Sequence, residues 1–231
     1  EGRKVSDKFE YRRSKEITEL LEQKYGLHPV EGRKKGEEWQ LKPVDVAKGD
    51  IKRQIACTLK PLLKLYSFRT MGELRALLSL YNIGVEEVKG EIGGRTYHGI
   101  LYTALDGNGE TAATPIKSSR LGRMTGAQQL DKKMQESAAK IKSDPCRERL
   151  RPLVAEALRQ SVDERDFRDR LAKEQIDLVL RRNGTGRIYG VTFIDHRSRT
   201  VLNGSRLGKD FSANALEARF NRSEEHTSEL Q

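Results

Sequence analysis

The stretch Tyr189–Gly208, YGVTFIDHRSRTVLNGSRLG, ends in a tetrapeptide, SRLG, that already occurs at Ser119–Gly122. The segment TYHGILYTA, residues 96–104, also combines tyrosine and glycine and precedes that first copy. Recurrence of the same order of features along a chain indicates a duplicated structural unit.

The two copies align over much of the chain at a nearly constant spacing. Thr70 and Asp163 are both good helix N-caps, and each is followed three residues later by an acid, which suits a helix start. Leucines at helical spacing follow the first cap, and Phe167 and Leu171 follow the second. Further matched pairs are Pro61 with Pro152, Ile83 with Ile176, Tyr97 with Tyr189 and Ser119 with Ser205.

Each copy predicts two helices followed by three strands. Gly93–Gly94 and the NGTG of Asn183–Gly186 supply turn chemistry between strands. Alternation in GVTFID puts Val191 and Phe193 on one face and Thr192 and Ile194 on the other, and we expect two helices to cover one face of each sheet. The predicted strands are Ile83–Lys89, Tyr97–Ala104 and Thr114–Lys117 in the first copy, and Ile176–Arg182, Ile188–Asp195 and Thr200–Asn203 in the second.

The expected fold class is α+β, with two tandem modules. We assign residues 51–126 to the first module, 127–144 to a charged helical linker and 145–221 to the second module. An amphipathic helix within residues 10–30, with Ile17, Leu20, Leu21 and Tyr25 as its apolar stripe, is expected to belong to an upstream domain. Residues 31–50 are expected to form a linker, and RSEEHTSELQ, residues 222–231, resembles a translated sequencing adapter.

The chain of 231 residues carries a formal charge of +10 and has a pI of about 9.6. This balance favours a polyanionic partner, most often nucleic acid, although lysine used for solubility is the open alternative. Cys57 and Cys146 lie far apart with no CxxC pair, which indicates a reducing compartment and no zinc site. The sequence contains no apolar run long enough to cross a bilayer, so no membrane partner is expected.

The usual catalytic patterns do not fit. The histidines show no metal-ligand spacing. Asp195 and His196 are adjacent on an expected strand and would face opposite ways, so Asp195 is interpreted as a turn cap. DGNGET, from Asp106, has the wrong residues for a calcium loop, and GTGRIYG joins two strands rather than a strand and a helix. We therefore predict no catalytic residue, metal site or cofactor in this segment.

Basic residues near the repeated strands are the remaining candidates for function. Guanidinium groups bind phosphates through paired hydrogen bonds, and Tyr97 and Tyr189 can stack on bases. The alternative is that the cations are solvated and the tyrosines pack on the sheet, and for the tyrosines we favour packing. The candidate nucleic-acid-binding residues are Arg12, Arg13, Arg95, Lys117, Arg120, Arg123, Arg187, Arg197, Arg199, Arg206 and Lys209.

Three segments of the sequence carry a resemblance to a known family: FRTMGELRALLSLYNIGVEEVKGE, YHGILYTAL and GRIYGVTFIDHRSRTVLNGSRLGKDFSANAL. They resemble the region that follows the nuclease domain in relaxases, the mobilisation nucleases of bacterial mobile elements. The resemblance implies a cytoplasmic bacterial protein that nicks DNA at a transfer origin by tyrosine-mediated transesterification, with a histidine-bound divalent metal. In that family the catalytic tyrosine and histidines precede the segment matching EGRKVSDKFEYRRSKEITELLEQKYGL, so they have no counterparts here.

We therefore expect a DNA-binding region of a relaxase, with single-stranded or transfer-origin DNA as its partner and no nicking activity of its own. Residues 1–30 would be the end of the nuclease domain, and Arg12 and Arg13 would lie near the DNA backbone. The rival interpretation is a module that docks the relaxase to accessory or coupling proteins. An independent RNA-binding protein is a third, weaker alternative.

Overall fold

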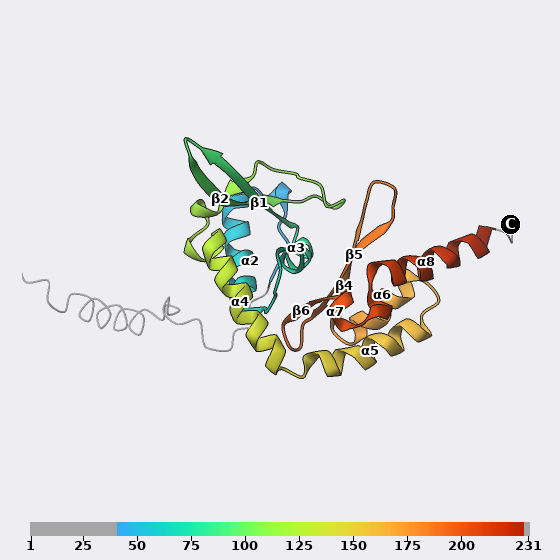
Figure 1. Ribbon diagram of the computed structural model, residues 1–231. Coiled ribbons are helices and arrows are strands. Elements are labelled where there is room, and N and C mark those ends of the chain that lie inside the picture. Colours follow the sequence, from blue (N-terminus) through green and yellow to red (C-terminus); the bar gives the residue numbers. More distant parts are fainter. Residues whose placement is uncertain (1–40, 229–231) are drawn as a thin grey trace, which may run out of the picture. The chain divides into compact units, whose positions relative to one another are not determined.

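The computed structural model of the chain describes residues 41–228, apart from the side chains of Ile92, Arg95 and residues 221–228. Two three-stranded antiparallel sheets and a set of helices make up this part, which confirms the predicted α+β class (Figure 1). The helix expected within residues 10–30 lies outside the described residues.

The first module has the predicted order of two helices and three strands. The side chain of Thr70 accepts a hydrogen bond from the backbone amide of Glu73, as expected for an N-cap. Gly93 and Gly94 both have positive φ angles, 58° and 75°, which a tight hairpin turn requires. The third strand is shorter than predicted. The elements are α2 (Ile51–Leu65), α3 (Met71–Ser79), β1 (Ile83–Ile92), β2 (Arg95–Ala104) and β3 (Ile116–Lys117).

The second module repeats this order. Asp163 caps its second helix by accepting from the amide of Asp166. Asn82 and Gln175, with φ angles of 55° and 60°, take the same left-handed conformation directly before the first strand of each sheet. The elements are α5 (Cys146–Gln160), α6 (Glu164–Lys173), β4 (Ile176–Arg182), β5 (Ile188–Asp195) and β6 (Thr200–Asn203).

Helices outside the repeat complete both cores. α4 (Ala127–Ser143) occupies the predicted helical linker, but it buries Leu130 in the first core and Ile141 in the second. After β6 the chain forms α7 (Gly204–Leu207) and α8 (Ala213–Ser228), which the sequence analysis did not predict. Leu207, Phe211 and Leu216 from this part are buried in the second core.

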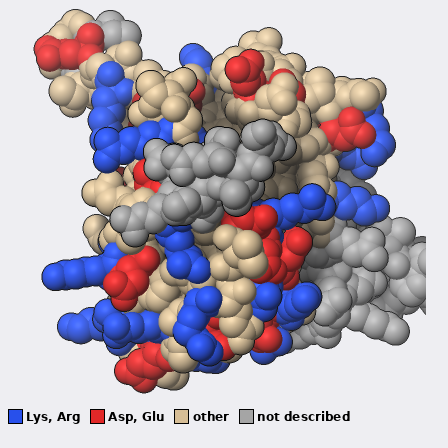
Figure 2. Space-filling view, turned by 90° about the vertical axis from the view of Figure 1, so that its right-hand side faces the viewer, with Lys and Arg blue, Asp and Glu red and all other residues tan. Residues whose placement is uncertain are grey.

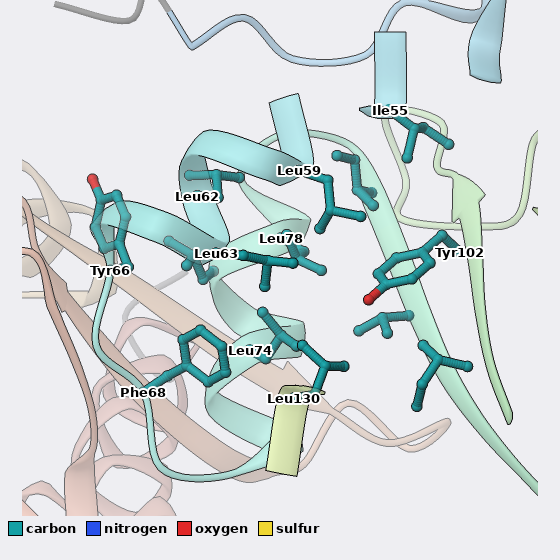
Figure 3. Close-up of a cluster of buried hydrophobic side chains, with 14 of the residues drawn as sticks. Ile55, Leu59, Leu62, Leu63, Tyr66, Phe68, Leu74, Leu78, Tyr102 and Leu130 are labelled. Atoms are coloured by element: carbon teal, nitrogen blue, oxygen red, sulfur yellow. The ribbon is translucent and has the colours of Figure 1, made fainter. Parts of the chain in front are cut away.

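The first core is a cluster of leucines between α2 and α3, closed by β2. Figure 3 shows Leu59, Leu62 and Leu63 of α2 facing Leu74 and Leu78 of α3, with Tyr102 of β2 alongside. All six side chains are buried. The hydroxyl of Tyr102 donates to the carbonyl oxygen of Thr125, 2.9 Å away, so its polar end is satisfied inside the core.

Residues 41–50 are not a free linker, in contrast to their assignment from the sequence. Val44 is buried in the first core, and its amide donates to the carbonyl oxygen of Tyr81. The side-chain amide of Asn82 donates to the carbonyl oxygen of Val44. The first module therefore begins about ten residues earlier than residue 51.

The second sheet is covered on both faces, whereas only one covered face was expected. Phe193 points into the second core, but Ile194 and Val201 are fully buried in the first core. The turn between α2 and α3 also pairs with β6: the Ser67 amide donates to Arg199, and the Val201 amide donates to Ser67. The first module thus supplies one layer of the second.

Shortening Ile194 tests this shared packing. We expect Ile194→Ala to lower the free energy of unfolding by about 2–5 kcal/mol, because it opens a cavity between the modules. Urea unfolding followed by circular dichroism measures the change. The control Val162→Ala removes methyl groups from a side chain that is 81% exposed and should change stability by less than about 0.5 kcal/mol. Equal effects of the two substitutions would contradict the shared core.

The two cysteines should react at different rates. Cys146 is buried in the second core and burial raises the pKa of its thiol, whereas Cys57 is exposed on α2. A raised pKa leaves less thiolate near neutral pH, and burial hinders access. We expect iodoacetamide to label Cys57 in the folded protein and Cys146 only after denaturant is added, as followed by mass spectrometry. Rapid labelling of Cys146 in the native protein would show that α5 is packed differently.

Candidate nucleic-acid interface

The repeated tyrosines are exposed, which corrects the expectation that they pack into the core. Tyr97 is 44% exposed and Tyr189 is 58% exposed. Both lie in the outer parts of hairpins, which extend past the helices covering each sheet (Figure 1). A large aromatic ring held on a strand and open to solvent is a ready stacking surface.

The backbone around the two tyrosines differs between the hairpins. Tyr97 pairs with Gly90, and a Cβ atom at Gly90 would lie 2.4 Å from the Tyr97 hydroxyl, so the ring crosses the neighbouring strand over a glycine. In the second hairpin Tyr189 directly precedes Gly190, whereas in the first hairpin Tyr97 lies two residues before Gly99. The β4–β5 register shifts here, because Arg181 pairs with Gly190 and Arg182 with Ile188, so Tyr189 is the extra residue of a β-bulge and has no cross-strand partner.

Arg181 converts the second hairpin into a mixed aromatic and cationic surface. Its guanidinium carbon lies 5.2 Å from the centroid of the Tyr189 ring, within the range of a cation–π contact. Its buried Nε has no hydrogen-bond partner among the described residues. Arg187 hydrogen-bonds the side chain of Asn214 at 3.2 Å. A groove of about 500 Å³ lies here, lined by residues that include Arg181, Asn183, Arg187, Tyr189, Asn203 and Asn214.

The basic residues chosen from the sequence do not form one surface. Arg187 directly precedes β5, whereas Arg197 and Arg199 lie in the turn after its end, roughly 23 Å away along an eight-residue strand. Arg197 is also engaged, because it hydrogen-bonds Gln175 and pairs with Glu174 at 3.6 Å. Lys117, Arg120 and Arg123 are exposed at the end of the first module, and Lys209 is exposed after α7.

The side chains of three chosen residues, Arg12, Arg13 and Arg95, lie outside what the structure describes. Arg12 and Arg13 lie outside the described residues, and only the backbone of Arg95 is described, at the start of β2. The sequence analysis did not single out Arg181. Arg181 lies beside the β-bulge and pairs with Gly190, which places it next to Tyr189. The alternation of apolar and polar residues in the sequence does not reveal a bulge, so this position could not be predicted.

On the face seen from the α8 side, the described basic side chains do not gather in one patch. Lys and Arg side chains are interspersed with Asp and Glu side chains there (Figure 2). On α6, Arg168 pairs with Glu164 and Arg170 pairs with Asp166, each at 2.9 Å. Charges that are already paired on this helix have less to offer a phosphate than the cations of the hairpin groove.

A buried carboxylate joins the two modules beside the groove. Glu73 of α3 is fully buried and accepts from the Arg69 amide at 2.6 Å and from the Asn203 amide at 3.2 Å. Arg206, one of the chosen residues, places its Nη1 4.0 Å from Glu73. That buried nitrogen has no hydrogen-bond partner within residues 41–228. Arg206 is thus positioned by the junction rather than by the hairpin.

Asp195 and His196 face different neighbours, as the sequence analysis expected. Asp195 is fully buried, accepts from the amides of Arg197 and Ser198, and pairs with Arg149, so it caps the turn. His196 Nδ1 lies 2.6 Å from the Tyr66 hydroxyl and Nε2 lies 2.8 Å from Asp177. Burial raises the pKa of Tyr66, which keeps this phenol protonated and linking the modules.

The described residues hold no group of three or more His, Cys, Asp or Glu side chains that could bind a metal ion. None of the helices within residues 41–228 is long and apolar enough to span a membrane. Comparison of the chain with protein-family models, with curated proteins and with solved structures finds no match.

Changing Glu73 tests whether the junction depends on this carboxylate. Glu73→Gln replaces one acceptor oxygen with a donor, so either the Arg69 or the Asn203 amide loses its buried partner. We expect a loss of about 1–3 kcal/mol in unfolding free energy, measured in urea. Glu136→Gln, in the exposed pair with Lys132, is the control and should change stability by less than about 0.5 kcal/mol. If Glu73→Gln left the free energy of unfolding unchanged, the Asn203 amide would not be bonded to Glu73 of α3 in solution.

Proposed function

We propose that residues 41–228 bind single-stranded DNA through the outer parts of the two hairpins. The observation that carries this proposal is the repeated tyrosine, which is solvent-exposed in both modules and in the second is accompanied by a guanidinium group. An aromatic ring that is open to solvent on a strand can stack on a base, and such stacking contributes about 1–3 kcal/mol per base.

The groove of the second hairpin supplies the three kinds of contact that a single strand needs. The Tyr189 ring offers a face to one base, and Arg181 and Arg187 offer donors to the adjacent phosphates. Asn183, Asn203 and Asn214 add neutral donors and acceptors around them. Stacking tolerates any base, so this surface would bind with little sequence preference.

The relaxase resemblance gives this binding a context. We propose that the region holds DNA beside the nuclease domain of a mobilisation protein in the bacterial cytoplasm, while the transesterification belongs to residues that the family places before this segment. Lys117, Arg120, Arg123 and Lys209 are exposed and would extend the phosphate contacts along the strand. Docking of accessory or coupling proteins is the outcome to be considered if DNA does not bind.

Removing the second tyrosine ring tests the proposal. We expect Tyr189→Ala to weaken binding of a fluorescent single-stranded oligonucleotide by about 5- to 150-fold, which corresponds to the loss of about 1–3 kcal/mol of stacking. Tyr189→Phe keeps the ring and should bind nearly as the parent protein does. Fluorescence anisotropy at several salt concentrations measures both affinity and the number of phosphate contacts.

The repeat supplies a second arm of the same experiment. Tyr97→Ala should also weaken binding, because Tyr97 matches Tyr189 in the sequence repeat and is likewise exposed in the outer part of its hairpin. The affinity should fall with salt, with a logarithmic slope of about −0.7 for each phosphate contacted. Absence of binding at low salt, or equal binding by Tyr189→Ala and the parent, would reject DNA binding by this surface and favour a protein partner.

A further inference from the structure

A second cavity, separate from the hairpin groove, lies where the two modules meet. It has a volume of about 1010 Å³, in the upper range of small-molecule sites. Its walls come from the α2–α3 turn, α4, the first turns of α5, β6 and α7. Both modules and the helix between them thus contribute to one space.

The charge of this lining is strongly unbalanced. Five of its side chains are basic and two are acidic, namely Asp144 and Glu148. One oxygen of Asp144 already accepts from the Cys146 amide at 2.8 Å, so that carboxylate is partly used in capping α5. The basic residues are Arg69, Lys142, Arg147, Arg151 and Arg206.

Two carboxylates share this space with five cations, so basic side chains are in excess among the residues that line it. Among the side chains that the structure describes, no ion pair involves Arg69, Lys142, Arg147 or Arg151, whereas α6 pairs two of its arginines along the helix. Arg206 has only the 4.0 Å contact with Glu73 and a buried Nη1 without a hydrogen-bond partner. The N-terminal turn of α5 adds its partial positive charge to the same space.

We infer that this cavity binds a ligand carrying closely spaced phosphate groups, and that the ligand bridges the two modules. Several guanidinium groups converging on one space match phosphate oxygens through paired hydrogen bonds. A monovalent anion would leave most of the excess charge unbalanced, whereas a diphosphate carries enough charge to compensate it. Bound there, it would contact Arg69 of the first module and Arg147 and Arg151 of the second.

Calorimetric titration with inorganic pyrophosphate at constant ionic strength tests the inference. We expect saturable binding of one pyrophosphate per chain, together with a rise in melting temperature. The double substitution Arg147→Gln with Arg151→Gln should weaken binding at least about tenfold, since it removes two charge-assisted donors. Both side chains are exposed, so circular dichroism should show an unchanged fold. Lys142→Gln, a single change on α4, provides a second variant with a smaller loss.

The control is Arg165→Gln on α6, an exposed arginine outside the cavity, which should bind pyrophosphate as the parent does. No saturable binding, or equal weakening by Arg165→Gln, would overturn the inference. Competition by a 5′-phosphorylated oligonucleotide would identify polynucleotide phosphates as the natural source, and absence of competition would identify a free diphosphate. Tyr189→Ala should leave pyrophosphate binding intact. The proposal of DNA binding at the hairpin and the proposal of phosphate binding in the cavity are therefore tested independently.

Discussion

Ile194 and Val201 project from the face of the second sheet that turns away from its own helices, and both are buried in the core of the first module. This contact fixes the relation between the repeats. It brings the Ser67 backbone into pairing distance of β6, places Glu73 against Asn203, and sets Tyr66 beside His196. The phosphate-binding cavity that we propose exists only because α4, α5 and the α2–α3 turn are held together in this way.

The two copies have diverged where this contact requires it. Val179 and Ile194, on the covered face of the second sheet, correspond through the strand registers to Glu86 and Thr103 in the first. Glu86 is exposed, and the Thr103 hydroxyl bonds the carbonyl oxygen of Ala113 at 2.9 Å. A polar face at these positions cannot serve as a second docking surface for a helix like α3. The packing is therefore one-directional, with the first module covering the second.

The elements of both modules could be predicted because their signals are local. Thr70 and Asp163 cap helices, and Gly93–Gly94 makes a turn, whatever the rest of the chain does. The exposure of Tyr97 and Tyr189 could not be predicted, since alternation assigns a side chain to a face but does not say whether anything covers that face. The burial of Ile194 and the convergence of Arg69 with Arg151 depend on contacts between distant segments. The relaxase context and the DNA partner stay predictions.

Hydrogen exchange followed by mass spectrometry tests most directly whether the modules form one body. The Ser67 amide donates to Arg199 and the Val201 amide donates to Ser67, so these two amides report the junction itself. If the account is right, peptides containing Ser67 and Val201 will exchange as slowly as those from β5, because opening them requires unfolding of the shared core. Fast exchange of both, with β1 and β4 still protected, would show that the modules fold independently and would contradict the account.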